Sequence, residues 1–220
     1  MLRIFIGTDP RQSVAYHVLA HSILKHATQP VSITPIRLAT LPMKRRGLTE
    51  FTYSRWLAPW LSGYTGQALF MDADMLVRGD LADLFTTADP DKAVSVVQSL
   101  HRFEWPSLML FNCEHPDCRS LTPEYIDDVA NQPASFKWTT DVGVLDKNFN
   151  HLVGYDKPNP DARVVHFTMG IPCWPETRGC EFSDEWNETA YEAMSSVTWQ
   201  ELMGNSVHVP HMGKLNLRTV

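Results

Sequence analysis

Two neighbouring carboxylates carry the clearest chemical signal in the sequence, in the motif Asp72-Ala73-Asp74. The apolar runs 68–71 and 75–77 flank this motif, so we expect the chain to be buried on both sides of it. Two neighbouring carboxylates that have no Lys or Arg paired with them in the motif suit a hard divalent metal ion, Mn²⁺ or Mg²⁺. Such an ion in turn binds a diphosphate. The alternative is an acidic strand end with solvated carboxylates. Asp-x-Asp alone is a weak signal, and the flanking apolar runs favour the metal site.

The elements that must position this motif alternate between strands and helices. The run before Asp72 has the length and composition of a strand buried on both faces of a sheet. Open α/β sheets bind ligands at the carboxyl edge, where the two carboxylates fall. The alternation predicts one α/β domain over residues 1–220, with a mixed, mostly parallel sheet. We expect strands at 3–6, 31–36, 68–71, 93–97, 105–112 and 163–167, and helices from Pro10, over 50–61, over 81–85, from Pro123 and over 183–203.

Composition excludes several classes of protein. The chain has 220 residues, 44% hydrophobic and 20% charged, which is typical of a globular domain and not of a fibre or a disordered tail. The net charge of -6 disfavours a nucleic-acid partner, because binding to a phosphate backbone depends on Lys and Arg. The first apolar run, 1–6, is too short for a signal peptide or a membrane span. We therefore expect a cytoplasmic protein without a transmembrane segment, whose four cysteines are ordinary thiols rather than zinc ligands.

Four stretches, in order along the chain, resemble family 8 glycosyltransferases and the related small bacterial and phage enzymes of that type. Together they cover residues 1 to about 174, and four ordered motifs are more specific than Asp-x-Asp alone. The stretches are Ile6-Gly7-Thr8-Asp9, Phe51-Thr52-Tyr53-Ser54-Arg55, the segment 68–81 around the acidic motif, and His166-Phe167-Thr168-Met169-Gly170.

The resemblance implies a GT-A fold, which is Rossmann-like, and transfer of a hexose from a nucleotide-sugar donor to a glycan or another hydroxyl acceptor. The donor is usually UDP-linked in such enzymes, and the anomeric configuration is retained. The resemblance also implies that Asp72, Asp74 and His166 bind Mn²⁺. The donor contacts that it implies are Thr8 and Asp9 on the uridine, Arg55 near the sugar and phosphates, and Gly170 at the diphosphate. We add Ala73, between the two carboxylates, and Trp174, close after Gly170, as further candidate donor contacts.

The chain departs from the family pattern after His166. The family commonly has His-x-x-Gly-x-x-Lys-Pro-Trp, whereas three residues separate His166 from Gly170 here and the following residues are Ile-Pro-Cys-Trp. The expected phosphate-binding Lys is therefore absent. The candidate replacements are Lys157, Arg163 and Arg178.

The family's Asp-Gln pair near the reacting sugar has no clear counterpart in this chain. Asp141 is the candidate carboxylate near the anomeric carbon, and the cap of a turn before Gly143 is the alternative role for it. Arg55 is the second candidate catalytic residue, with a surface ion pair to Glu50 as its alternative. Trp138 and Trp174 are candidate platforms for sugar rings.

Two other functions are compatible with parts of the sequence. A haloacid-dehalogenase-type phosphatase also places Asp-x-Asp after an apolar strand, but it has Thr or Ser where this chain has Leu76. A non-catalytic nucleotide-sugar-binding protein would explain the missing Lys. In the glycosyltransferase interpretation the core spans about 1–174, and 175–220 forms a C-terminal helix and tail.

Overall fold

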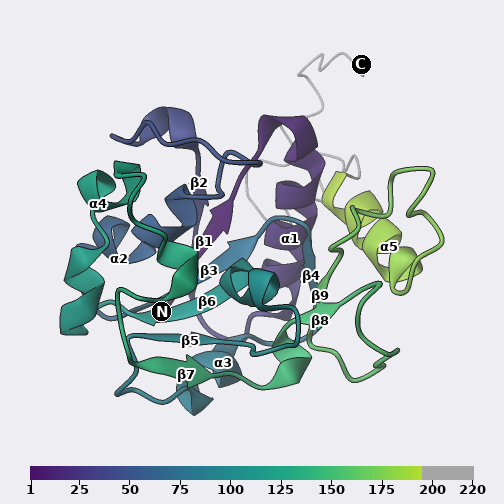
Figure 1. Cartoon of the computed structure of the whole chain (residues 1–220). Helices are drawn as coiled ribbons and strands as arrows, with labels where there is room; N and C mark the ends of the chain where they lie inside the picture. The colour runs from purple at the N-terminus through teal and green to yellow at the C-terminus, as the bar shows by residue number, and fades with distance from the viewer. Residues whose placement is uncertain (195–220) are drawn as a thin grey trace, which may run out of the picture.

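The computed structural model of the chain describes residues 1–194 and has a six-stranded sheet at its centre (Figure 1). The strand order is β2-β1-β3-β6-β5-β7. β6 pairs antiparallel with both β3 and β5, and the other pairs are parallel. The predicted mixed, mostly parallel sheet is confirmed. The strands are β1 Leu2–Gly7, β2 Val31–Ile36, β3 Gln67–Asp72, β5 Val94–Val96, β6 Leu108–Asn112 and β7 Val142–Val144.

A smaller, three-stranded sheet lies beside the first and has the order β4-β9-β8. Its strands are β4 Met75–Val77, β8 His151–Leu152 and β9 Val164–His166. β4 follows β3 after only two residues, and β9 pairs antiparallel with β4. The late strand therefore returns next to the acidic motif by joining this second sheet, and not by a crossover within the central sheet.

Helices cover both faces of the central sheet. α1 (Ser13–His26) packs against β4 and against α5 (Ser183–Met194), and these two helices lie side by side in Figure 1. α2 (Ala58–Leu61) and α4 (Pro123–Asp127) lie at the opposite side of the view, and α3 (Ala82–Thr87) lies below the sheet near β5 and β7. None of the helices within residues 1–194 is both long and apolar enough to cross a bilayer.

Alternating side chains of the central strands build two separate cores. Ile4 and Ile6 of β1 and Met71 of β3 pack in the core that contains α1, β4, β9 and α5. Phe5 of β1 and Phe70 of β3 point to the other face, where they join a core that contains α2 and α4. This alternation follows from the two-residue period of a strand, and it explains why β1 and β3 read as continuous apolar runs.

Most predicted elements are present, with shifted ends. The strand at 31–36 has the expected bounds, and Thr122 caps α4 by accepting a hydrogen bond from the backbone N–H of Tyr125. Asp9 caps a 3₁₀ turn, η1 (Pro10–Gln12), and α1 starts only at Ser13. Pro59 occupies the first turn of α2 and does not end a helix. The predicted helix over 183–203 is present as α5 to Met194, and its remainder lies outside the described residues, as does the rest of the expected tail.

Candidate functional site

Asp72, Asp74 and His166 meet at the carboxyl end of β3. Each offers one ligand atom, and these atoms lie within 4.8 Å of one another. Nε2 of His166 is 3.4 Å from Oδ1 of Asp74. Asp72 and His166 are buried, with 8% and 2% of their surface exposed, and Asp74 is half-buried. The structure thus assembles the three predicted metal ligands into one group of two carboxylates and an imidazole, a donor set that Mn²⁺ accepts.

Several polar atoms of this group make no hydrogen bond, although Oδ1 of Asp72 and Oδ1 of Asp74 each face a basic side chain. Oδ1 of Asp72, Oδ1 of Asp74 and Nδ1 of His166 are buried and make no hydrogen bond within the described part of the chain. Buried polar atoms are normally hydrogen-bonded, and each exception requires an explanation such as a bound ion. The atoms that make no hydrogen bond are those of the predicted ligands, so the residues present fit a divalent cation.

Strand pairing brings these residues together. Asp72 is the last residue of β3, and Asp74 is the residue before β4. In the antiparallel pair β4–β9, His166 lies opposite Met75, one residue from Asp74. The backbone N–H of Phe167 donates to the carbonyl of Asp74 at 2.9 Å, which extends the pairing past the strand end. The site is therefore built on two paired strands and their junction with the central sheet.

Arg55 provides the positive charge beside Asp72. Its Nη1 lies 3.1 Å from Oδ1 of Asp72, and it donates to Oδ2 at 3.2 Å and to the carbonyl of Pro106 at 2.9 Å. Only 12% of the Arg55 side chain is exposed. The alternative pairing with Glu50 is not observed, because Glu50 pairs with Arg46. Arg55 is thus fixed beside Asp72, and its contact with the donor stays a prediction.

Burial and neighbouring charges shift the pKa values of Asp72 and Asp74 in opposite directions. Burial raises the pKa of Asp72 to about 7, although Arg55 opposes this shift. Burial is also the largest effect on Asp74, but the charge and hydrogen bond of His166, a backbone hydrogen bond and the charge of Arg55 together outweigh it, so the pKa of Asp74 lies below its ordinary value. Asp74 is therefore the more strongly ionised of the pair.

The carboxylate of Asp9 is engaged within the protein. Its Oδ1 accepts hydrogen bonds from the backbone N–H and Nε of Arg11, both at 2.9 Å, and its Oδ2 accepts from Nη2 of Arg11 at 2.6 Å. The backbone N–H of Glu50 also donates to Oδ2 of Asp9, at 3.4 Å. Nη2 of Arg11 donates further to the carbonyl of Leu48 at 2.8 Å. Asp9 therefore links η1 to the loop before Phe51 through hydrogen bonds. Only a contact of Asp9 with uridine was predicted from the sequence, and not this structural role.

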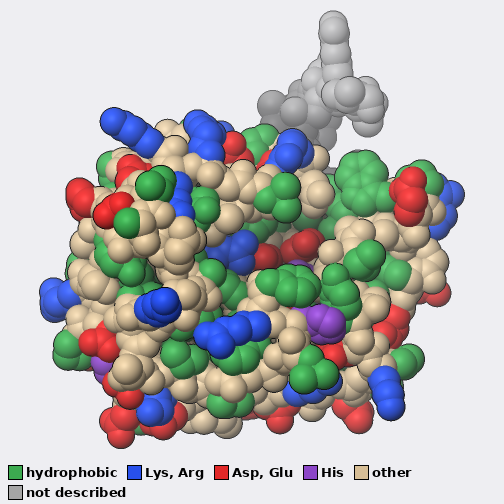
Figure 2. Space-filling view, viewed as in Figure 1, with side chains coloured by type: hydrophobic (Ala, Val, Ile, Leu, Met, Phe, Trp, Pro, Cys, Tyr) green, Lys and Arg blue, Asp and Glu red, His purple; other side chains and the backbone are tan. Residues whose placement is uncertain are grey.

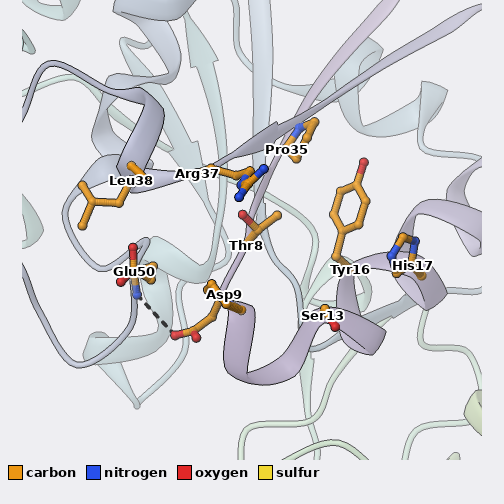
Figure 3. A pocket seen from close by; sticks show the side chains of 11 residues that line it. Thr8, Asp9, Ser13, Tyr16, His17, Pro35, Arg37, Leu38 and Glu50 are labelled. Carbon is orange, nitrogen blue, oxygen red and sulfur yellow. Dashed lines mark hydrogen bonds between the residues drawn. The ribbon is translucent and has the colours of Figure 1, made fainter.

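A cavity of about 410 Å³ opens above the carboxyl ends of β1 and β2 (Figure 3). Tyr16 and His17 of α1 stand on one side of it, and Arg37 points toward Thr8 across it. The hydroxyl of Thr8 donates to the carbonyl of Ile36 at 2.7 Å and fixes this edge. Sequence reasoning found Thr8 and Asp9 in this wall but missed Tyr16, His17 and Arg37, since no motif marks them.

A smaller cavity of about 100 Å³ lies on the other side of Asp9 and is lined by Arg11, Phe51, Ala73 and Asp74 among others. Asp9 lines both cavities, so they adjoin. The two cavities together extend from the first strand to the acidic motif. Figure 2, viewed as in Figure 1, shows a hollow between the positions of β3 and β9 in which acidic and basic side chains gather.

Gly170 and Trp174 lie together after β9. Gly170 has φ +113°, and a Cβ placed on it would be 3.4 Å from the ring of Trp174. A side chain is strained in this backbone conformation, so a glycine is favoured there. Trp174 is 42% exposed and presents an indole ring to solvent beside the turn. Trp138, by contrast, packs against Trp56 and Phe111 in the core and is not a free platform.

The structure does not bring Asp141 to this site. Asp141 precedes β7, and the strand register aligns the start of β7 with Val94, Phe111 and Ala68, at the edge of the sheet opposite Asp72. Its carboxylate lies 3.4 Å from Nζ of Lys92 and 3.5 Å from Nε2 of His115. The prediction failed because the segment before β7 carries a carboxylate at the amino end of a strand, not at its carboxyl end.

Of the three candidate replacements for the missing Lys, Arg163 is engaged elsewhere. Nη1 of Arg163 pairs with Asp83 at 2.6 Å, and its Nη2 donates to the carbonyl of Asp80 at 2.6 Å. Lys157 and Arg178 are exposed side chains. Arg11 is instead the cation that shares a cavity with Asp74.

Comparisons with known proteins agree with this geometry. The model of glycosyl transferase family 8 matches residues 10–171. Protein CDI of Arabidopsis thaliana is 35% identical over 217 residues, 84% of each chain.

Solved structures with the same fold include GlyE of Streptococcus pneumoniae TIGR4 (TM-score 0.66, 16% identity, 86% of this chain and 61% of that chain). The galactosyltransferase LgtC gives a TM-score of 0.61 at 14% identity, over 90% of this chain and 98% of that one. This chain thus spans less than two thirds of GlyE but nearly all of LgtC. The predicted GT-A fold is confirmed, and the chain belongs to glycosyl transferase family 8 and is a glycosyltransferase.

Proposed function

We propose that the protein transfers a hexose from a nucleotide-sugar donor, UDP-linked, to a hydroxyl group of a glycan or another acceptor, with retention of anomeric configuration. The observation that carries this proposal is the group of Asp72, Asp74 and His166, whose ligand atoms lie within 4.8 Å of one another and include buried atoms that make no hydrogen bond. These three residues would hold Mn²⁺ or Mg²⁺. The cation would supply Lewis-acid neutralisation of the leaving diphosphate.

The two adjoining cavities suit the two parts of the donor. The larger one, beside Thr8 and Tyr16, has space for a nucleoside, and it lies beyond the carboxyl ends of parallel strands, where such sheets bind nucleotides. The smaller one leads to Ala73 and Asp74, so the diphosphate would lie there. The published structure of LgtC contains donor and acceptor sugar analogues, which supports a sugar donor for this fold.

The protein's own residues have distinct parts in this proposal. Arg11, held by Asp9, keeps Nη1 available for the phosphates and takes the place of the missing Lys. Arg55 holds the Asp72 carboxylate in place and adds a fixed guanidinium near the sugar. Gly170 lets the backbone approach the diphosphate, and Trp174 offers a ring face to the sugar.

Donor turnover tests the proposal. The full chain is incubated with UDP-, GDP- and ADP-linked hexoses in Mn²⁺, without acceptor and with a panel of saccharides, and released nucleoside diphosphate is measured. We expect release from UDP-hexose that is abolished in Asp74→Asn. Release from none of the donors, with nucleotide binding intact, would instead support a non-catalytic nucleotide-sugar-binding protein. Release that Asp74→Asn leaves unchanged would refute the assigned site.

A further inference from the structure

Glu104 is a carboxylate beside the candidate metal group that no sequence motif marks. It lies in the 3₁₀ helix η4 (Arg102–Ser107), directly before β6, and only 15% of its side chain is exposed. Its Oε2 lies 3.8 Å from Nδ1 of His166. A buried carboxylate next to the imidazole of a candidate metal ligand can decide which ring nitrogen carries the proton and which one binds the metal.

The two ring nitrogens of His166 face different carboxylates. Nε2 is directed toward the acidic motif, 3.4 Å from Oδ1 of Asp74, whereas Nδ1 is directed toward Glu104. Nδ1 is buried and has no hydrogen-bond partner within residues 1–194. A neutral imidazole that binds a metal through one nitrogen carries its proton on the other, and that N–H is normally held by an oxygen acceptor.

We propose that Glu104 is a positioning residue that accepts a hydrogen bond from Nδ1–H of His166 and so leaves the lone pair of Nε2 free for the cation. This inference rests on the proposed metal site of Asp72, Asp74 and His166. The distance of 3.8 Å must shorten to about 2.7–3.2 Å for the hydrogen bond to form. Such hydrogen bonds are often long in an apo structure and tighten when the site is loaded.

Glu104 acts through His166 and is not itself a ligand. The group whose ligand atoms lie within 4.8 Å of one another contains Asp72, Asp74 and His166 but not Glu104. Glu104 approaches the nitrogen of the ring that faces away from Asp74. The imidazole therefore separates the Glu104 carboxylate from the cation position.

The backbone of η4 is fixed by contacts that also reach the site. The N–H of Glu104 donates to the carbonyl of His101 at 2.9 Å, and the hydroxyl of Ser107 donates to the carbonyl of Glu104 at 2.6 Å. The buried Asn150 donates to Oγ of Ser107 at 2.9 Å. Arg55, which contacts Asp72, donates to the carbonyl of Pro106 in the same helix. A preorganised helix of this kind lets one carboxylate select the tautomer of His166.

Mn²⁺ affinity without donor tests this role. Binding of Mn²⁺ to the full chain is measured by electron paramagnetic resonance for wild type, Glu104→Ala, Glu104→Gln and Asp74→Asn. We expect the Kd for Mn²⁺ to rise about 10- to 100-fold in Glu104→Ala. Glu104→Gln should recover most of this loss, because an amide oxygen accepts the same hydrogen bond.

The matched control is Glu114→Ala. It removes a carboxylate that accepts a hydrogen bond from the backbone N–H of Gly66, far from the candidate metal group, and it should leave the Kd for Mn²⁺ unchanged.

The tautomer of His166 gives a second readout that needs no variant. Long-range ¹H–¹⁵N correlation of the wild-type protein in diamagnetic Mg²⁺ should show the proton on Nδ1, and a proton on Nε2 would overturn the role of Glu104. A Kd for Mn²⁺ in Glu104→Ala equal to that of the wild type, together with loss of Mn²⁺ binding in Asp74→Asn, would also overturn the role of Glu104. The proposed metal site would still hold in that case. Absence of Mn²⁺ binding to the wild type would overturn the metal site and the inference together.

Discussion

His166 lies opposite Met75 in the antiparallel pair of β9 and β4, and this register sets an imidazole beside the carboxylate of Asp74. The relationship explains how two segments far apart in the sequence form one group. Strand register is strongly specified here, because both Met75 and the neighbours of His166 are buried. A slip of one residue would turn His166 to the other face of the strand.

Replacement of Arg55 tests whether the Asp72 carboxylate depends on it. Arg55→Met leaves a buried carboxylate without its charge-assisted hydrogen bond, so we expect the free energy of unfolding to fall by about 1.5–3 kcal/mol, measured by urea denaturation. Arg46→Met removes the exposed pair with Glu50 and should cost less than about 1 kcal/mol. Equal losses in the two variants would contradict a special role for the pair of Arg55 and Asp72.

The ion pair of Asp9 and Arg11 predicts an acid-sensitive contribution to stability. The hydrogen bond from Arg11 lowers the pKa of Asp9 from 3.8 to about 2. A carboxyl group whose folded-state pKa is depressed contributes stability above its unfolded pKa and loses it as the pH falls through the folded value. We therefore expect the wild type to lose more stability than Asp9→Asn between about pH 4 and 2, measured by thermal melts. Parallel curves for the two proteins would show that the pair contributes nothing.

Arg11 should distinguish a diphosphate from a nucleoside. In Arg11→Ala we expect the affinity for UDP in Mn²⁺ to fall about tenfold or more, because a charge-assisted hydrogen bond is lost, and the affinity for uridine to change much less. Calorimetry with both ligands makes the comparison. An equal loss for UDP and uridine would mean that the variant disturbs the larger cavity and that Arg11 does not bind phosphate.

The backbone conformation of Gly170 limits which residue types fit at that position. Its φ of +113° is unfavourable for a side chain, so Gly170→Ala should destabilise the protein by about 1–3 kcal/mol. Gly179 provides the matched control, since its φ is not positive and a Cβ there would meet nothing within 4 Å. A thermal melt of both variants decides the matter, and similar melting temperatures would remove the backbone argument.

The sequence was informative where local chemistry and packing coincide. Asp72 and Asp74 follow a strand buried on both faces, so their place at the carboxyl edge of the sheet was predictable. His166 was assigned through the resemblance to family 8, and its actual route to the site, through a second sheet, was not foreseen.

Other parts of the site were beyond sequence reasoning for a physical reason. Glu104 lies in a short 3₁₀ helix and Arg37 directly after β2, and the directions of their side chains depend on long-range packing, which leaves no periodic signature in the sequence. The contact of Asp9 with uridine stays a prediction, whereas the ion pair of its carboxylate with the Arg11 side chain, two residues away, was not foreseen. Asp141 had the right residue type, but it lies at the amino end of β7, at the edge of the sheet opposite Asp72.

We propose that Asp72, Asp74 and His166 bind a divalent cation through which a nucleoside diphosphate is held. Calorimetry of UDP binding with and without Mn²⁺, for wild type and Asp74→Asn, tests it most directly. We expect UDP binding to the wild type to depend on Mn²⁺ and to be lost in Asp74→Asn. Equally tight UDP binding without the metal, or in Asp74→Asn, would contradict it.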